Sequence, residues 1–328
     1  MVDGCKKEAL YELVEIPESF GPVDVVVDDA KIRSYAFAQG DYGSWYFGDS
    51  PFGERIAHPL VFANDLLFLF YEGYDGNTAQ GLHTHERLRF VSPVHVGERV
   101  TISGGYVDKY ERRGQGYVVL KAEARGEDGR LLVEHEGREI MRTVAGDIAG
   151  GHRATPSGRV VRAESRSDLP IAEHAERGLA PLTPVTGVSH RFDQDQMLVF
   201  SWAGKGFANV HTSVEKARKS GLDRTIVQAQ QQTGAIAESM AAFFGASWFT
   251  SGSLDLRFVG PAFVDELLTV RGAVVGEPTA GRLELEVWVE KEGGAKTALG
   301  WASADLAGVT PGPEQLLSRL ERRRNRNP

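Results

Sequence analysis

The chain has 328 residues, which is long for one hydrophobic core and natural for two units of similar size. Its 41% hydrophobic and 25% charged residues are ordinary for a globular protein, and no apolar run is long enough to cross a bilayer. The net charge of -8 argues against nonspecific binding of nucleic acid. A single cysteine and an N-terminus without the apolar segment of a signal peptide predict a cytoplasmic protein.

The first half of the chain predicts a strand, a helix, a buried helix and then four strands. Residues 23–27 are β-branched, and an aspartate can cap a helix over residues 30–39. After a loop rich in glycine and serine, residues 59–71 are apolar on nearly every side, as in a helix that is buried all round. The strands that follow, separated by turn signals, are 83–94, 99–110, 116–125 and 131–142.

Residues 145–181 lack any periodicity, and we interpret them as a linker. The same order of elements then returns. The expected helices and strands are a strand at 185–192, helices at 194–202, 215–220 and 225–244, and strands at 248–261, 267–276, 282–291 and 296–306.

A local repeat supports the duplication. Residues 88–93 read LRFVSP and residues 256–261 read LRFVGP, 168 positions further along. Both segments pass through a short turn into another similar strand at the same spacing, which predicts two like domains packed as a pseudo-dimer. The predicted boundaries are an N-terminal domain over 1–145, a linker over 146–182, a C-terminal domain over 183–310 and a basic tail over 311–328.

This layout resembles the hotdog fold, and residues 32–70 resemble the MaoC-like (R)-specific enoyl-CoA hydratases. The signature of that family is a loop G-D-x-N-P-x-H followed by A-H-G at the buried helix. Here residues 40–42 read Gly-Asp-Tyr and residues 56–59 read Ile-Ala-His-Pro. The duplicated form is similar to double-hotdog hydratases. Two loops, at 42–44 and 208–211, most resemble the mesaconyl-CoA hydratase-like branch.

The resemblance implies an α+β protein with a tandem (double) hotdog fold, in which each half wraps a long antiparallel sheet on a buried helix. It also implies reversible hydration of a 2-enoyl thioester or dehydration of its 3-hydroxyacyl counterpart. The substrate is an acyl-CoA or acyl-carrier thioester, with CoA as part of the substrate and no further cofactor or metal. We expect no nucleic-acid or membrane partner, and either a homodimer or a pseudo-dimeric monomer.

The sequence departs from the family signature in both halves. The family holds one water between an Asp and a His five positions apart. Five positions after Asp41 stands Tyr46, and five positions before His211 stands Gly206, so each half keeps one member of the pair. In the first half, Pro59 replaces the glycine of A-H-G and lacks the backbone N–H. The first half therefore carries the degenerate site, and the second half is the candidate active site.

Hydration of an enoyl thioester needs a base for the water and a donor for the enolate oxygen. A neutral histidine suits the first task, and His211 is the candidate. Backbone N–H groups at a helix start suit the second, which makes Ala229 and Gln230 candidates on the substrate side. Gln228 is a further catalytic candidate, as a donor to the thioester or as a residue that orients His211. Otherwise Gln228 only caps its helix.

Four other residues are weaker candidates. Asp41 is a catalytic candidate at the acidic position of the family, or else it caps the break after the preceding helix. Tyr46 is a candidate weak acid or substrate contact. His58 and Asn209 are candidates for binding substrate; the alternatives are a helix-entry histidine and an ordinary turn residue.

Two other functions stay open. One is a hotdog thioesterase, which would use an acidic residue such as Asp41, Asp65 or Glu238 to activate water. The other is a diverged protein without hydratase activity that acts on, or binds, an unusual acyl thioester. The broken Asp/His pairs favour that alternative.

Overall fold

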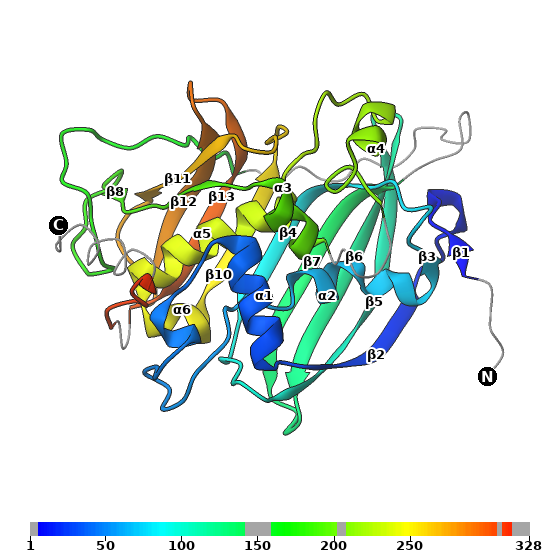
Figure 1. The fold of residues 1–328 in the computed structure, drawn as a ribbon. Helices are drawn as coiled ribbons and strands as arrows, with labels where there is room; N and C mark the ends of the chain where they lie inside the picture. Colours follow the sequence, from blue (N-terminus) through cyan, green and yellow to red (C-terminus); the bar gives the residue numbers. More distant parts are fainter. Residues whose placement is uncertain (1–5, 142–158, 202–207, 307–309, 317–328) are drawn as a thin grey trace, which may run out of the picture.

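The computed structural model describes residues 6–141, 159–201, 208–306 and 310–316. In this part of the chain, eleven strands form one continuous, almost wholly antiparallel sheet (Figure 1). Its path is β2-β5-β6-β7-β4-β10-β13-β12-β11-β8, and β9 also pairs with β11. The strands of the first half are β2 (Glu18–Val26), β4 (Leu82–Phe90), β5 (Arg99–Arg112), β6 (Gln115–Gly126) and β7 (Leu131–Met141). Those of the second half are β8 (Pro184–Val185), β9 (Ser189–Arg191), β10 (Ser253–Phe258), β11 (Leu267–Val274), β12 (Arg282–Lys291) and β13 (Lys296–Asp305).

The two halves meet where β4 pairs with β10. These are the strands that carry the repeated sequence, and they run antiparallel, with Leu88 opposite Leu254 and Glu86 opposite Leu256. Two like sheets are thereby joined edge to edge about a pseudo-twofold axis. The predicted tandem hotdog fold is confirmed, with the strands packed against helices on one face of the sheet (Figure 1).

The helices begin where the sequence predicts caps. Asp28 accepts a hydrogen bond from the N–H of Lys31 at the start of α1, and Asp193 accepts one from Gln196 at the start of α3. The helical elements are η1 (Tyr11–Leu13), α1 (Asp29–Gln39), η2 (Ser44–Tyr46), α2 (Ala63–Leu67), η3 (Phe68–Glu72), α3 (Gln194–Phe200), α4 (Val214–Lys219), α5 (Ala229–Phe244) and α6 (Ala246–Ser251). A small separate sheet pairs β1 (Lys7–Glu8) with β3 (Tyr74–Asp75).

Helix α5 is the centre of the molecule, and almost all of it is buried. Helix α1 crosses it closely because Gly234 has no side chain; a Cβ there would lie 2.4 Å from the side chain of Gln39. Two hydrogen bonds fix the crossing, from Gln39 Nε2 to the carbonyl of Gln231 at 2.8 Å and from Gln231 Nε2 to the carbonyl of Ala38 at 3.1 Å. The buried glutamines of α5 therefore join the two halves.

The buried segment of the first half is not one helix, in contrast to the prediction for residues 59–71. It is a turn, then the five residues of α2, then the 3-10 turn η3. The segment is rich in phenylalanine, which is a weaker helix former than alanine, and no side chain caps α2. Burial fixes its position while leaving its backbone irregular. The alanine- and glutamine-rich α5 has the propensity that this segment lacks.

Residues 248–251 are also not the start of a strand, as their aromatic and β-branched character predicts. They belong to α6, which is set off from α5 by Gly245 at φ 59° and from β10 by Gly252. Trp248 is fully buried against Phe90 and Phe244. Tertiary packing of the indole therefore outweighs the local strand preference.

Candidate active site

The loop that carries His211 is built by the side chain of Asn209. The amide oxygen of Asn209 accepts hydrogen bonds from the N–H groups of His211 at 2.9 Å and Thr212 at 3.1 Å. The N–H of Asn209 donates in turn to Thr212 Oγ1 at 3.1 Å. Since the amide oxygen already serves the turn, only its NH2 group remains for a substrate, and a binding role for Asn209 stays a prediction.

The imidazole of His211 is anchored through one nitrogen only. Its Nδ1 lies 2.7 Å from the carbonyl oxygen of Ile226, so Nδ1 carries the proton and Nε2 keeps a free lone pair. The carbonyl of His211 accepts a hydrogen bond from Gln194 Nε2 at 2.9 Å. The residue is half-buried, but close packing around the ring lowers the pKa of His211 to about 4. The ring is therefore neutral at physiological pH.

The anchor of His211 lies three residues before α5. At this helix start, the N–H groups of Gln231 and Gln232 both donate to the carbonyl of Gln228, at 3.1 and 3.3 Å. Within the described part of the chain, the N–H groups of Ala229 and Gln230 have no acceptor. Two free donors and the positive end of the helix dipole thus follow, within four residues, the carbonyl that anchors this neutral histidine.

The side chains of the two candidate glutamines differ in their contacts. Gln228 Nε2 donates to the hydroxyl of Ser201, so this buried amide links α3 to α5, and its catalytic role stays a prediction. The amide nitrogen of Gln230 is buried and has no hydrogen-bond partner among the residues that the structure describes. Such an unsatisfied donor is costly in a protein interior and marks a place for a ligand or water.

The corresponding loop of the first half has the same backbone geometry. The N–H of Ile56 donates to the carbonyl of Trp45, the residue before Tyr46, at 3.2 Å. The N–H of Ile226 donates to the carbonyl of Val210, the residue before His211, at 3.3 Å. Tyr46 therefore occupies the place of His211, as the five-residue spacing from Asp41 predicts. The matching position before His211 is Gly206, which lies outside the described residues.

The first half also has its own helix entry. The N–H of Ala57 donates to the carbonyl of Val94, in the loop after β4. The N–H of Val227 donates to the carbonyl of Ala262, in the loop after β10, and both distances are 2.8 Å. His58 therefore takes the place of Gln228, and the proline after it takes the place of the first residue of α5. Because proline has no N–H, the first half lacks one of the two donors that α5 offers.

Asp41 and His58 form a buried pair at this first-half position. They are 1% and 3% exposed, and His58 Nε2 lies 3.5 Å from Asp41 Oδ2. The N–H of Leu60 donates to His58 Nδ1 at 3.0 Å, which places the ring proton on Nε2, toward Asp41. Tyr35 and Tyr46 contact the imidazole with ring centroids at 4.9 and 5.6 Å, and the hydroxyl of Tyr35 has no hydrogen-bond partner among the described residues.

Asp41 is also coupled to α5. Gln315 Nε2 donates to Asp41 Oδ1 at 2.6 Å and to Glu238 Oε1 at 3.0 Å, and His190 Nε2 lies 2.6 Å from Glu238 Oε2. Burial, and then the charge of Glu238, raise the pKa of Asp41 to about 8. Burial opposes a charge on His190, but its hydrogen bond to Glu238 outweighs this and raises the pKa of His190. Asp41 is therefore a neutral acid at pH 7.

The candidates thus fall into two groups. Asp41, Tyr46 and His58 lie together in the first-half centre, and the other candidates lie together around His211. In the described residues no hydrogen bond or ion pair joins Asp41 to His211. The two centres are neighbours. Phe200 accepts a hydrogen bond from Asn64 and contacts the ring of Tyr35 in the first-half centre. The next residue, Ser201, accepts a hydrogen bond from Gln228 in the second.

The neutral state of Asp41 predicts how stability depends on pH. The folded protein keeps a proton that the unfolded chain releases near pH 4, so wild type loses up to about 1.4 kcal/mol per pH unit between about pH 4 and pH 8. Asp41→Asn removes this loss. The free energy of unfolding is measured for both proteins by chemical denaturation from pH 5 to 9. The value for the variant minus the value for wild type should increase up to about pH 8 and then level off.

A matched control for this experiment is the exposed Asp49→Asn. Its stability should differ from that of wild type by the same small amount at every pH. If the Asp41→Asn variant also differs by a constant amount, Asp41 is charged in the folded protein and its assigned neutral state is wrong.

Sequence reasoning missed four buried ionisable residues, His83, Glu86, His135 and Glu139. The pattern predicts surface or cross-strand positions for the histidines. Instead they lie on the inner face of β4 and β7, and Thr233 of α5 donates a hydrogen bond to Glu86 Oε2 at 2.6 Å. A signal was present, since strands that read as half-buried carry ionisable residues at positions that should be apolar.

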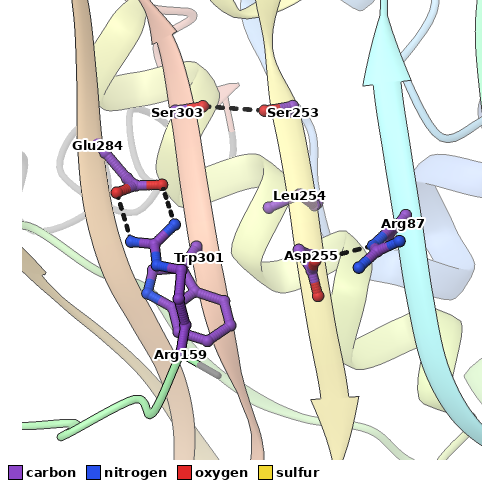
Figure 2. Close-up of a pocket in the computed structure, with 8 residues that line it drawn as sticks. All are labelled: Arg87, Arg159, Ser253, Leu254, Asp255, Glu284, Trp301 and Ser303. Carbon is purple, nitrogen blue, oxygen red and sulfur yellow. Dashed lines mark hydrogen bonds and ion pairs between the residues drawn. The ribbon is translucent and has the colours of Figure 1, made fainter. Parts of the chain in front are cut away.

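A separate pocket lies on the outer face of the sheet, away from α5 (Figure 2). Arg159 stacks on Trp301 at 4.6 Å from the ring centroid and forms two hydrogen bonds with Glu284. Arg87 pairs with Asp255 at 2.8 Å in the same pocket. These charges neutralise one another and hold the chain after residue 159 on the sheet, which is a structural role.

The sheet and its central helix define a double-hotdog fold. Solved structures agree. The chain is similar to a MaoC-like dehydratase, with a TM-score of 0.66 and 15% identity over 90% of this chain and all of the other. It is also similar to a conserved hypothetical protein from Mycobacterium tuberculosis with a double hotdog fold, with a TM-score of 0.62 and 14% identity over 91% of this chain and 98% of the other.

A third similar structure is the peroxisomal multifunctional enzyme type 2 from Drosophila melanogaster, with a TM-score of 0.58 and 19% identity. The match covers 88% of this chain and 48% of that enzyme. No family model matches the sequence, and no curated protein matches it. At these identities the likeness establishes the shared fold. None of the helices in the described residues has the length and apolar character to span a bilayer.

Proposed function

We propose that this protein reversibly hydrates a 2-enoyl thioester, with His211 as the base and the first turn of α5 as the oxyanion site. The observation that carries the proposal is the anchoring of Nδ1 to the carbonyl of Ile226. It leaves Nε2 without a partner among the described residues, in a half-buried loop whose anchor lies three residues before Ala229. The N–H groups of Ala229 and Gln230 likewise have no acceptor there. A base and two oxyanion donors are the minimum that this chemistry requires.

The reaction can be written with His211 as the only proton carrier. Nε2 removes a proton from water as the oxygen bonds to C3, and the electrons of the double bond move to the thioester oxygen. The N–H groups of Ala229 and Gln230 stabilise that oxygen. The imidazolium then returns its proton to C2, which restores the thioester and the neutral base. A single group suffices, in keeping with a glycine at position 206 and no carboxylate in contact with His211 in the described residues.

The first-half centre supports this choice of site. Asp41 is a buried neutral acid, its paired His58 has a pKa lowered by burial to about 3, and Pro59 removes one donor. The carboxylates that a thioesterase would use are engaged elsewhere. Asp65 pairs with Lys31 at 2.7 Å, while Glu238 binds His190 and Gln315.

Two parts of the proposal are more specific: the group that carries the acyl chain, and the branch of the hydratase family. CoA is proposed as the carrier because the resemblance is to CoA-dependent hydratases. The mesaconyl-CoA hydratase-like branch rests on the loop motifs at 42–44 and 208–211. The proposed partner is an acyl thioester, and no cofactor beyond the substrate's own CoA is required by the chemistry above.

The direct test is hydration of a panel of 2-enoyl-CoA thioesters, beginning with crotonyl-CoA and followed by loss of enoyl absorbance. We expect saturable turnover without release of free CoA. Thiol release with the enoyl group intact would favour a thioesterase instead. A protein that binds the thioesters but turns none over would favour the diverged alternative and overturn the hydratase.

The pKa of the base predicts the pH profile of this activity. His211 must be unprotonated to accept a proton from water, and its pKa is lowered to about 4. We therefore expect kcat/KM to stay nearly constant from pH 8 down to about pH 5 and to fall below it. An unperturbed histidine would lose activity near pH 6.5. A decrease in kcat/KM centred near pH 6.5, in protein that circular dichroism shows to be folded, would contradict the environment assigned to His211.

A further inference from the structure

The four residues that sequence reasoning missed form one buried cluster beneath α5. His83 Nδ1 lies 3.3 Å from Glu139 Oε1, and His135 Nε2 lies 3.3 Å from Glu86 Oε1. The two imidazole rings are stacked, with centroids 6.5 Å apart. Thr233 donates to the second oxygen of Glu86 at 2.6 Å, which ties the cluster to the central helix. Two histidines and two carboxyl groups are therefore held together in the interior.

Part of the hydrogen-bonding capacity of this cluster is unused. Within the described parts of the chain, His83 Nε2 and His135 Nδ1 are buried without a hydrogen-bond partner, and so is Gln230 Nε2. Gln230 precedes Thr233 by three residues, so both side chains lie on the same face of α5. Each unpaired donor or acceptor destabilises the interior. Such groups persist where a bound molecule or water completes them.

The charges of the cluster indicate which chemical group would fit. Burial opposes a charge on His83, but its hydrogen bond to Glu139 and the charge of Glu86 raise the pKa of His83. Burial likewise opposes a charge on Glu86, but its contacts with His135 and His83 lower the pKa of Glu86. Among the described residues, Gln230 Nε2 is a donor without an acceptor, and His83 Nε2 is a ring nitrogen without a partner. A third carboxylate would be repelled by the two present, so a neutral oxygen is the better acceptor.

The cluster lies one helical turn from the proposed oxyanion site. The hydroxyl of Thr233, which donates to Glu86, also lies 3.2 Å from the carbonyl oxygen of Ala229. One turn of helix spans about 5.4 Å, roughly four bonds of an extended carbon chain. An acyl chain whose thioester oxygen binds the N–H groups of Ala229 and Gln230 thus has the length to bring an oxygen on C5 or C6 to the cluster.

We propose, on the basis of the hydratase function above, that His83, His135, Glu86, Glu139 and Gln230 form a polar acyl subsite. It receives a hydroxyl or carbonyl oxygen near C5 or C6 of the enoyl thioester. In the described residues, no three metal-ligating side chains are arranged to hold an ion, which leaves an organic oxygen as the ligand that the donors fit. The subsite would favour oxygenated over plain alkyl acyl chains.

The test compares two matched pairs of thioesters. The reacting pair is hex-2-enoyl-CoA and 6-hydroxyhex-2-enoyl-CoA, compared by kcat/KM. The non-reacting pair is hexanoyl-CoA and 6-hydroxyhexanoyl-CoA, compared by Kd from calorimetry. We expect wild type to prefer the hydroxylated member of each pair by about tenfold, the equivalent of about one good hydrogen bond. A chain that ends in a carboxylate should be the poorest ligand.

The variant His83→Leu should reduce the preference to about one while changing the values for the alkyl thioesters little. His135→Leu serves as a second variant in case the first fails to fold. His85→Leu is the matched control, because His85 points to the outer face and pairs with Asp255 at 2.7 Å. It should keep the preference of wild type.

The two pairs separate the possible outcomes. If wild type turns over neither enoyl thioester but binds the hydroxylated saturated one more tightly, and His83→Leu abolishes this difference, the subsite stands and the hydratase function fails. If turnover occurs with no preference in either pair, the cluster holds only buried water and the subsite is wrong. A preference that His85→Leu removes as fully as His83→Leu also overturns it.

Discussion

His211→Ala should lower kcat/KM for enoyl-CoA hydration by about 10²–10⁴-fold, the usual contribution of a positioned general base. The loss should appear in kcat more than in KM, because the imidazole acts on the water and the acyl carbon and does not hold the CoA. Initial rates of enoyl absorbance loss, measured over a range of crotonyl-CoA concentrations, give both constants. The effect is large because no second acid–base group contacts His211 in the described residues.

His211→Asn distinguishes chemistry from loop structure. The asparagine NH2 can take the place of Nδ1 and keep the hydrogen bond to the carbonyl of Ile226, but it offers no base. It should therefore be as inactive as the alanine variant while unfolding at nearly the same temperature as wild type. The exposed His174→Ala is the control and should be fully active. Hydration at the wild-type rate by either His211 variant would remove His211 from the mechanism.

The sequence predicts the overall fold because a duplicated pattern carries more information than any single element. The two LRFV segments lie on β4 and β10, which pair with each other at the centre of the sheet. The predicted equivalence of Tyr46 and His211 also holds in the backbone hydrogen bonds of their loops. The five-residue spacing from Asp41 is enough for this inference, although the loop from His211 to Ile226 is longer than the loop from Tyr46 to Ile56 and contains α4.

The inward position of His83 could not be predicted, and a β-bulge is the physical reason. Along β4, alternation from Phe90 back through Leu88 and Glu86 places the even positions inside. The register shifts between His83 and His85, so His83 turns to the inner face as well. A bulge moves every side chain beyond it to the other face, and nothing in the local sequence marks it.

The pairing of Asp41 with His58 was out of reach for a different reason. The two residues come from separate segments, and Gln315, near the other end of the chain, completes the contact with Asp41. Family spacing directs attention to a histidine five positions away, where Tyr46 stands. Long-range contacts of this kind follow from how the two halves pack, which no pattern along the chain specifies.

Ala229→Pro should lower kcat by about 10²–10³-fold, the loss typical when one oxyanion donor is removed, and leave the fold intact. Proline is well tolerated at the first position of a helix, where its missing N–H has no partner to lose. Gln228, with φ −65° and ψ 146°, already has the extended backbone that a following proline requires. The change copies the first half of this protein, where Pro59 stands at the equivalent place.

The matched control is Ala229→Ser, which changes the side chain and keeps the N–H. Its kcat should remain within about threefold of wild type, as expected if only the backbone donor at this position matters. Both variants should have wild-type thermal stability, because the N–H of Ala229 has no acceptor in the described residues. If the proline variant retains full kcat, the enolate oxygen is not stabilised at the start of α5. Equal losses in both variants would instead assign the effect to crowding by the side chain.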